Sequence, residues 1–317
     1  MGLISAAYRK FFLHRYDDNG YVKYFTYEDF PGLSAEPASF PSGGNTLRGY
    51  FYRGDAEPKD ALVVFSHGIG GGHRSYMTEI DEIAKAGYTV FAYDNTGCFE
   101  SEGDGVGCMS QSLADLDAAV RFLKSSGVFG QYRHVYAVGH SWGGFAVGNV
   151  PRFHPEIEKC VVISGFLSVK TLLSAFTAKV PFGKAVVRRL LAYEKKAAPD
   201  YWDADIADAL KNTGTRYLFA HSADDPSVAF APNTGALREQ FPEHLYLVYT
   251  DRGHNPNYTA DAAKYLAGTF GEFNRLNRKG KLKTLDQKKA FFAPVDWRRM
   301  TKQDADFWRQ VFAFFAD

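Results

Sequence analysis

The sequence predicts an α/β fold in which helices cover both faces of a mostly parallel sheet. Two features carry this prediction: a run of strand length that is apolar at every position, and amphipathic stretches that alternate with such runs. Ala61–Phe65 contains no polar residue, as expected of a strand buried on both faces of a parallel sheet. Ser75–Ala86 then carries apolar residues at helical spacing and stops at Gly87, so it predicts a helix.

The same alternation continues along the chain. The further strands that it predicts are Tyr88–Tyr93, Val135–Val138, Cys160–Ile163, Arg216–Ala220 and Leu245–Tyr249. The further helices that it predicts are Leu113–Leu123, Phe145–Asn149 and the aromatic closing stretch Trp308–Phe315. Ahead of the first parallel strand, Pro37–Phe40 and Leu47–Tyr52 flank a Ser-Gly-Gly-Asn sequence and predict a hairpin.

An insertion is expected between two of these strands. About fifty residues separate the strands at Cys160 and Arg216, more than an ordinary connection needs. They contain the helical stretches Leu167–Phe176 and Ala185–Tyr193. We therefore expect residues 167–213 to form a helical cap over the carboxyl edge of the sheet, where such folds bind ligands. A helix pair on the outside of the molecule is the alternative.

The rest of the chain divides into a core and an arm. Residues 36–166 and 214–317 hold the predicted strands and form the expected core. Residues 1–35 are rich in tyrosine and phenylalanine, and we expect them to pack on the body because so many aromatic side chains are unfavourable in water. Residues 258–299 have no assigned role, and the basic stretch 277–289 is expected to be a solvated loop or helix face.

The composition limits the partners and the compartment. Lysine and arginine total 37 against 36 acids, so the chain as a whole has no field that attracts nucleic acid or an anionic membrane. No apolar run approaches the roughly 20 residues of a membrane span, and no signal peptide is evident, so we expect no stable membrane insertion. The cysteines Cys98, Cys108 and Cys160 lack metal-ligand spacing and suit a reducing cytoplasm. We expect a small, roughly neutral partner without metal or organic cofactor, and leave homo-oligomers open.

A candidate nucleophile lies between a predicted strand and a predicted helix. Gly139-His-Ser-Trp-Gly143 fits G-x-S-x-G and follows the uncharged run Val135–Val138. Glycines suit the flanking positions because a nucleophile on so tight a turn has a strained backbone, and larger side chains would collide with strand and helix. Such a turn exposes the Ser141 hydroxyl and leaves the N–H of Trp142 free to face an oxyanion. The alternative is a glycine-rich turn with an incidental serine.

A base and an acid for this serine follow later in the chain. A serine hydroxyl needs a base, which is usually a histidine held by a carboxylate. The strand at Arg216 runs into a segment with Asp224 and Asp225, and the strand at Leu245 runs into one with His254. Because each group directly follows its own strand, serine, acid and histidine are expected at one edge of the sheet, in that chain order.

These motifs resemble those of the α/β-hydrolase superfamily, in the branch of soluble esterases, acylglycerol lipases and serine aminopeptidases. The resemblance covers roughly residues 37–255 and the closing helix, and implies the α/β-hydrolase fold. Besides the serine turn, His67–Gly70 is similar to the family's oxyanion loop and Asp94–Gly103 to its loop after the fourth strand. Gly253-His254 is similar to its histidine turn.

The resemblance also implies roles for individual residues. Asp225 opens the D-P-x-V arrangement of similar family members and is preferred to Asp224 as the acid, while Asp251 is expected to cap or pair locally. The backbone N–H of Ile69 is the expected second oxyanion donor beside that of Trp142.

The chain departs from the family pattern in one loop. Thr96 stands where the family usually has arginine, and Phe99 where it usually has glycine.

Other residues of this region have simpler interpretations. His140, at the variable position of the serine turn, is expected to be a packing residue, and His67 is expected to brace the oxyanion loop. His221 beside Asp224 suggests a metal pair, but no third ligand is spaced to join them. Gly68–Gly72 lacks the Lys-Ser/Thr ending of a phosphate-binding loop.

Together the motifs predict a serine hydrolase that cleaves small to medium carboxylic esters through an acyl-enzyme on Ser141. His254 is the expected base, Asp225 orients it, and the N–H groups of Ile69 and Trp142 stabilise the oxyanion. Activity is expected to fall as the pH drops through roughly 6 to 7, because a protonated histidine cannot act as a base.

Three alternatives keep the same fold. A serine aminopeptidase needs an acidic group in the cap to hold the substrate amine. The acids available there are Glu194, Asp200, Asp203 and Asp205. A thioesterase uses the same acyl-transfer chemistry. A non-catalytic ligand-binding protein keeps the cavity of the fold as a receptor, but it has no need of the complete set of serine, acid, histidine and oxyanion donors.

Overall fold

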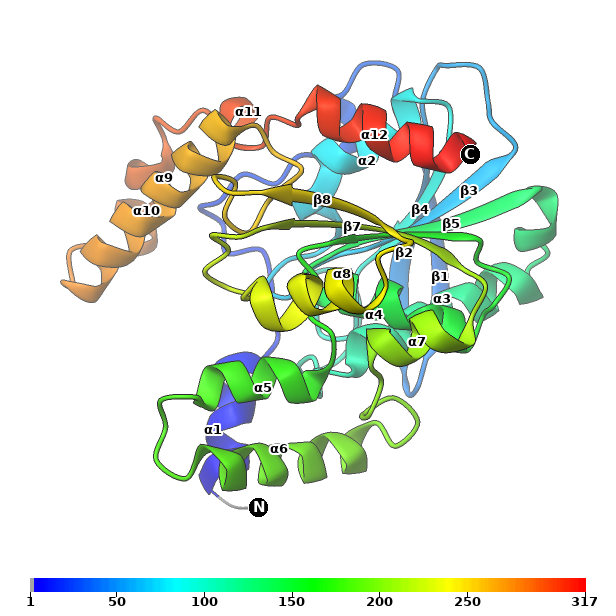
Figure 1. The fold of residues 1–317 in the computed structure, drawn as a ribbon. Helices are drawn as coiled ribbons and strands as arrows, with labels where there is room; N and C mark the ends of the chain where they lie inside the picture. The colour runs from blue at the N-terminus through cyan, green and yellow to red at the C-terminus, as the bar shows by residue number, and fades with distance from the viewer. Residues whose placement is uncertain (1–2) are drawn as a thin grey trace.

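One eight-stranded sheet runs through the centre of the structure, a computed structural model that describes residues 3–317 (Figure 1). The strands are β1 (Ser34–Ser42), β2 (Asn45–Arg53), β3 (Ala61–Ser66), β4 (Thr89–Tyr93), β5 (His134–His140), β6 (Lys159–Ile163), β7 (Arg216–Ser222) and β8 (Leu245–Tyr249). Their order across the sheet is β1-β2-β4-β3-β5-β6-β7-β8. Residues 1 and 2 of the expected arm lie outside the described residues.

The sheet is mostly parallel, as the sequence predicts. The pairs β4–β3, β3–β5, β5–β6, β6–β7 and β7–β8 are all parallel. Only β2, the strand next to the edge strand β1, runs antiparallel to its neighbours β1 and β4. The predicted hairpin is confirmed, and its paired residues extend from Ser34 to Arg53, further than the alternation of the sequence indicated.

Helices cover both faces of the sheet. They are α1 (Leu3–Phe12), α2 (Met77–Lys85), α3 (Gln111–Ser125), α4 (Trp142–Asn149), α5 (Val169–Thr177), α6 (Gly183–Ala197), α7 (Ile206–Asn212), α8 (Ala236–Gln240), α9 (Ala260–Arg278), α10 (Leu285–Phe292), α11 (Trp297–Met300) and α12 (Ala305–Ala316). Leu62 and Val64 of β3 belong to the apolar cluster that includes α3 and α4, whereas Val63 and Phe65 belong to the one that includes α2 and α12. This alternation explains why the strand is apolar at every position.

The candidate site residues follow the carboxyl ends of parallel strands. Ser141 directly follows β5, and the loop that begins with His67 directly follows β3. Asp225 lies just beyond β7, and His254 lies just beyond β8. Because these strands are parallel, their carboxyl ends meet at one edge, which therefore gathers the candidate residues.

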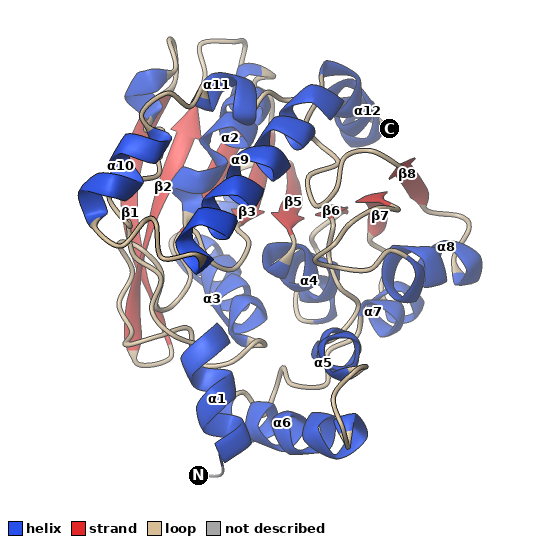
Figure 2. Cartoon of the chain, turned by 90° about the vertical axis from the view of Figure 1, so that its left-hand side faces the viewer, coloured by secondary structure: helices blue, strands red, loops and turns tan. Residues whose placement is uncertain are grey.

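Three helices, α5, α6 and α7, lie in the long connection between β6 and β7, where the sequence indicated two. The arm contributes α1, which packs on α6, with the rings of Tyr8 and Tyr193 6.0 Å apart. In both Figure 1 and Figure 2, α1, α5 and α6 lie together at one end of the molecule, below the sheet.

The segment with no role assigned from the sequence forms α9, α10 and α11. Phe273 and Phe292 of this segment build a small apolar cluster with Leu282, and Tyr21 of the arm stacks on it. These helices thus have their own core, which the arm completes. No helix within residues 3–317 is both long and apolar enough to cross a bilayer.

Candidate active site

Ser141 stands on a sharp turn between β5 and α4. Its backbone φ is 57° and its ψ is −112°, a conformation that a residue other than glycine adopts only where the surrounding structure holds it. A hydrogen bond from the Ser141 N–H to the Ile163 carbonyl, at 2.8 Å, fixes the turn. A Cβ on Gly143 would lie 2.0 Å from the Ser66 carbonyl oxygen, so only glycine fits there.

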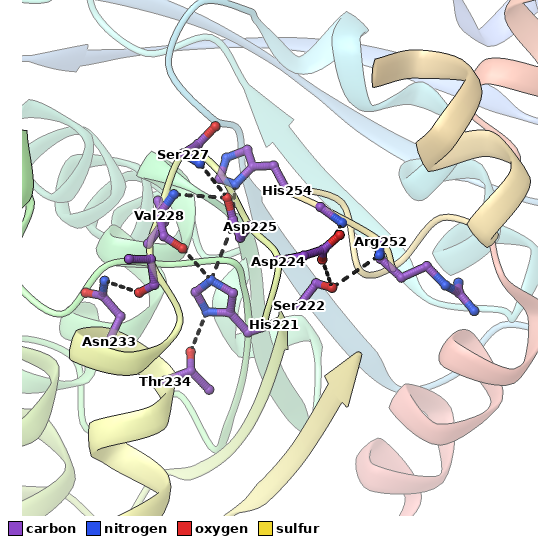
Figure 3. A network of polar contacts seen from close by, with 12 residues as sticks. His221, Ser222, Asp224, Asp225, Ser227, Val228, Asn233, Thr234, Arg252 and His254 are labelled. Carbon is purple, nitrogen blue, oxygen red and sulfur yellow. Dashed lines mark hydrogen bonds and ion pairs between the residues drawn. The ribbon is translucent and has the colours of Figure 1, made fainter. Parts of the chain in front are cut away.

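A histidine and a buried aspartate meet beyond the ends of β8 and β7 (Figure 3). Nδ1 of His254 lies 2.7 Å from Oδ2 of Asp225. The Asp225 side chain is completely buried, whereas that of His254 is 21% exposed. The structure therefore brings together the acid and the histidine that the sequence assigned to one site, and it leaves the imidazole accessible.

The surroundings of Asp225 favour its ionised form. The N–H groups of Ser227 and Val228 donate to Oδ1 at 2.8 and 3.0 Å, and Nε2 of His221 lies 3.2 Å from Oδ2 (Figure 3). Burial alone would raise the pKa of the Asp225 carboxyl, but hydrogen bonds from His221 and His254 outweigh it and hold that pKa well below its usual value. An ionised carboxylate accepts the Nδ1–H of His254, which leaves Nε2 of His254 free to accept a proton.

Asp224 is placed to hold the histidine turn rather than the imidazole. Its Oδ1 accepts hydrogen bonds from the Ser222 hydroxyl at 2.5 Å and from the Gly253 N–H at 3.0 Å. Gly253 has a φ of 54° and directly precedes His254, so this contact fixes the turn that carries the histidine. The geometry thus favours Asp225 over Asp224 as the partner of the imidazole.

His140 links the serine turn to the histidine turn. Its Nε2 lies 2.7 Å from the His254 carbonyl oxygen, and this nitrogen carries the proton because a carbonyl can only accept. Its Nδ1 then accepts a hydrogen bond from the Tyr76 hydroxyl at 2.9 Å, and that hydroxyl accepts one from the Gly68 N–H at 3.0 Å. The interpretation of His140 as a packing residue is therefore incomplete: it is buried, but both ring nitrogens join separate loops.

The neutrality of His140 predicts an acid-sensitive fold. Burial, and next the nearby His254, lower the pKa of His140 to about 3. Between about pH 6.5 and this value the unfolded chain binds a proton at His140 that the folded chain does not, so stability falls as the pH decreases. The free energy of unfolding is expected to drop between pH 7.5 and 4.5 by about 2 to 3 kcal/mol less in His140→Gln than in the wild type. Urea unfolding at the two pH values measures this, and equal drops in the two proteins would contradict it.

The two predicted oxyanion donors lie next to Ser141. Trp142 follows Ser141 as the first residue of α4. Ile69 follows Gly68, and Gly68 is so near the serine that a Cβ added to this glycine would lie 3.3 Å from the Cβ of Ser141. Within the part of the chain that the structure describes, the N–H groups of Ile69 and Trp142 donate to no other protein group. Both are thus available to an oxyanion.

His67 braces the oxyanion loop, as the sequence predicts. Its Nδ1 donates to the Gly68 carbonyl at 2.8 Å, and its Nε2 accepts from the Asn95 N–H at 2.9 Å. Burial lowers the pKa of His67, which favours the neutral ring that these two contacts require. The ring therefore joins the loop after β3 to the loop after β4.

Residues 63–310 match the model of a family described as the alpha/beta hydrolase family, and this match covers most of the chain. The chain belongs to the alpha/beta hydrolase family. The fold predicted from the motifs is thereby confirmed, and the eight-stranded, mostly parallel sheet agrees with it.

Individual relatives of this alpha/beta hydrolase are distant. A proline iminopeptidase from Clostridioides difficile is 28% identical over 172 residues, which are 54% of this chain and 57% of that protein. The chain spans about half the length of the curated relatives it matches. An esterase from Pyrococcus furiosus has a TM-score of 0.58 at 17% identity, with 86% of this chain and 97% of that chain covered. An acylaminoacyl peptidase from Pyrococcus horikoshii has a TM-score of 0.52 at 15% identity, with 72% and 39% covered. These structural likenesses establish the fold and leave the substrate open.

An arginine from the arm reaches the loop in which this alpha/beta hydrolase departs from the family pattern. Thr96, which stands at the usual arginine position, bonds Asp115 through its N–H at 2.7 Å and its hydroxyl at 2.9 Å. The guanidinium of Arg15 donates to the carbonyls of Phe99, Ser101 and Gly103 at 2.6 to 2.9 Å. A cation from the arm therefore holds the loop.

Glu194 connects α6 to the neighbourhood of Trp142. Its buried carboxylate accepts hydrogen bonds from the Tyr8 hydroxyl at 2.8 Å, the Met109 N–H at 2.9 Å and both the N–H and hydroxyl of Ser110 at 3.0 and 2.9 Å. The Met109 carbonyl in turn accepts from the Trp142 indole at 2.6 Å. One carboxylate thus fixes the arm and α6 beside the serine turn.

The suggested metal pair and phosphate loop have other contacts. Both ring nitrogens of His221 are occupied, since Nε2 also lies 2.8 Å from the Val228 carbonyl and Nδ1 lies 2.7 Å from the Thr234 hydroxyl (Figure 3). Among residues 3–317, no group of three or more His, Cys, Asp or Glu side chains is arranged to hold a metal ion. The glycine-rich loop runs into His73, whose N–H donates to Asp94 at 2.7 Å, and this carboxylate would repel a phosphate.

Sequence reasoning missed the roles of Arg15, Tyr76 and Glu194 around the site. Arg15 contacts carbonyls 84 to 88 positions away, and Glu194 contacts Met109 across 85 positions. No local pattern encodes such pairs. The sequence named Glu194 only as one of four acids available in the cap, and gave no signal for the contacts that it makes.

Proposed function

We propose that this alpha/beta hydrolase is a serine hydrolase that cleaves small to medium carboxylic esters through an acyl-enzyme on Ser141. The observation that carries the proposal is the bond from His140 to the His254 carbonyl. His140 directly precedes Ser141, and its Nε2 lies 2.7 Å from the His254 carbonyl oxygen. Nδ1 of the same His254 lies 2.7 Å from Oδ2 of Asp225. The nucleophile, base and acid of the chemistry therefore belong to one connected arrangement.

The acylation step uses each group in turn. Nε2 of His254 takes the proton of the Ser141 hydroxyl while the oxygen attacks the ester carbonyl carbon. The N–H groups of Ile69 and Trp142 stabilise the resulting oxyanion, and the ionised Asp225 stabilises the imidazolium. The tetrahedral intermediate then collapses, and the alcohol leaves with the proton from Nε2.

Deacylation repeats the sequence with water. His254 removes a proton from a water molecule, whose oxygen attacks the acyl carbon. A second tetrahedral intermediate collapses to the free acid, and Ser141 recovers its proton from Nε2. His140 acts as a positioning residue throughout, because it holds the backbone of His254 and stays neutral at working pH.

The substrate class is tested with a series of p-nitrophenyl esters from acetate to laurate, and with an aminoacyl anilide as control. The proposal expects ester turnover with a preferred acyl length, and little or no cleavage of the anilide. Efficient cleavage of the anilide with no ester turnover would contradict it and support a peptidase.

The second candidate is an aminopeptidase, which the proline iminopeptidase relatives favour. Such an enzyme needs a carboxylate that is free to bind the substrate amine. Glu194 is fully buried and accepts four hydrogen bonds, and the Asp205 side chain accepts the Ala207 N–H at the start of α7. Asp200 and Asp203 of the four acids named from the sequence stay exposed and are the remaining candidates for such a carboxylate. We rank the esterase first because the other two acids, including the buried Glu194, are already engaged by hydrogen bonds within the chain.

The compartment is a further part of the proposal. Cys98, Cys108 and Cys160 are buried free thiols. Burial raises the pKa of each thiol well above its usual value, which makes them unreactive. Three buried thiols outside any disulfide support a reducing compartment such as the cytoplasm.

A further inference from the structure

Exposed apolar side chains concentrate at the end of the molecule formed by α1, α5 and α6. Phe182 is 88% exposed and Phe11 is 67% exposed. Of the nine large apolar side chains that are exposed within residues 3–317, six lie here: Ile4, Phe11, Phe12, Phe176, Val180 and Phe182. Separate segments bring them together, since the rings of Phe12 and Phe176 stack at 5.6 Å and Ile4 borders the same hollow as Phe182.

Phe182 is costly in two ways. It has a φ of 58°, in the left-handed region that disfavours bulky side chains. Its side chain is also almost wholly exposed to water, so the free energy that burial of a phenylalanine ring provides is not gained. The start of α6 helps to hold this backbone conformation, because the Phe182 carbonyl accepts from the N–H groups of Ala185 and Val186 at 2.8 and 3.2 Å. No contact within the described chain buries the ring, which indicates that the ring serves a contact outside the molecule.

The same end is strongly basic, although the chain is almost neutral. Six exposed cations lie on the α5–α6 turn and on α6: Lys179, Lys184, Arg188, Arg189, Lys195 and Lys196. None of them forms a salt bridge with any of the described residues, and the single acid of α6, Glu194, is buried. We call this set of cations, together with the six apolar side chains, the docking face.

The docking face is also hollowed. A cavity of about 850 Å³ lies between α5 and α6, with Val187 and Leu191 among the apolar residues that line it. Lys170, Lys184 and Lys195 also line it. No residue of the candidate active site lines this cavity, so the face is separate from the site.

We infer that the docking face binds the surface of an anionic lipid bilayer, with the exposed phenylalanines in the interface and the lysines and arginines on the headgroups. Aromatic rings flanked by basic side chains, on helices that do not span, are the pattern of an interfacial contact. A second copy of the chain is a poorer occupant, because a symmetric contact would place these cations against one another. The inference does not depend on which bond the active site cleaves.

The test is co-sedimentation with vesicles of phosphatidylcholine alone and of phosphatidylcholine mixed with phosphatidylserine, at low and high sodium chloride. The wild type is expected to bind the anionic vesicles, and to bind them more weakly at high salt because the charges are screened. Phe11→Ala combined with Phe182→Gly is expected to lower the partition coefficient at least about tenfold. Neither change should harm the fold, since Ala suits a helix and Gly suits a positive φ.

Matched variants separate charge and apolar contact from general effects. Lys179→Glu combined with Lys184→Glu is expected to reduce binding about tenfold or more. The control pair Lys281→Glu with Lys283→Glu lies in the other basic stretch, and Leu285→Ala removes an exposed apolar side chain there. These controls are expected to bind like the wild type.

Two results would overturn the inference: no binding to anionic vesicles at low salt, or binding that the docking-face variants leave unchanged. Dimers in solution that Phe11→Ala with Phe182→Gly dissolves would also overturn it, in favour of a second copy as occupant. Failure here is distinct from failure of the proposed chemistry. Ser141→Ala is expected to bind vesicles normally, and the docking-face variants are expected to hydrolyse water-soluble p-nitrophenyl acetate at the wild-type rate.

Discussion

Ser141→Ala is expected to lower the kcat for p-nitrophenyl ester hydrolysis by about 10⁴-fold or more, because no other group of the site can form the acyl-enzyme. The residual rate would come from substrate binding and the two oxyanion donors alone. Steady-state kinetics with the preferred ester measures the loss, and thermal unfolding checks that the fold is retained.

Ser227→Ala is the matched control for this serine. Ser227 is exposed and contributes its backbone N–H, not its hydroxyl, to Asp225, so the contact survives the change. Its activity is expected to stay close to that of the wild type. If Ser141→Ala were as active as the wild type, Ser141 could not be the nucleophile.

Asp225→Asn is expected to reduce kcat by about 10⁴-fold, and to lower stability at neutral pH because the folded chain favours the ionised carboxylate. The amide keeps an oxygen that can accept from Ser227 and Val228, but an amide nitrogen facing His254 favours the wrong tautomer of the imidazole. Kinetics over a range of pH distinguishes this tautomer effect from a simple loss of folded protein.

Asp224→Asn is the informative partner of that variant. The amide oxygen of the substituted side chain can still accept from Gly253, so the histidine turn should keep its shape and the activity should fall by no more than about tenfold. The reverse order of effects, with the larger loss in Asp224→Asn, would assign the acid to Asp224. The two aspartates are neighbours in the chain, and the geometry favours the one that the resemblance to the D-P-x-V arrangement also preferred.

The strands and the order of the motifs were predictable because buried strands of a parallel sheet require apolar residues at successive positions. β3 is buried at every position, and Ser141, the pair Asp224 and Asp225, and His254 each follow a predicted strand, so position placed these groups at one edge. The preference for Asp225 over Asp224 came from the resemblance to the D-P-x-V arrangement of the family. The strained backbone of Ser141 was predictable from a different signal, the glycines of the G-x-S-x-G motif, and it appears in the structure as a positive φ.

Contacts between distant segments were not predictable. The bonds of Arg15 to the loop of Phe99 and of Glu194 to Met109 depend on how the arm and α6 fold back, which no local pattern records. His140 was interpreted from its position in the motif, but its role follows from the backbone of a turn 114 positions later.

Whole-chain charge was a poor guide to the surface. The count of 37 basic against 36 acidic residues excludes a global field, yet the acids are absent from the exposed part of α6. The net charge of the whole chain therefore gave no indication of the basic docking face. This face could be recognised only from the structure, in which α1, α5 and α6 lie together (Figures 1 and 2).

The most direct test of the central claim is covalent labelling with a fluorophosphonate, which forms a stable phosphonyl ester with an activated serine. Intact-mass and peptide analysis are expected to show one phosphonyl group per chain, on Ser141, with loss of ester turnover in proportion to labelling. His254→Ala is expected to label far more slowly, because the base that activates the hydroxyl is gone. A protein that stays unlabelled and active, or that is labelled at another residue as activity is lost, would contradict the account.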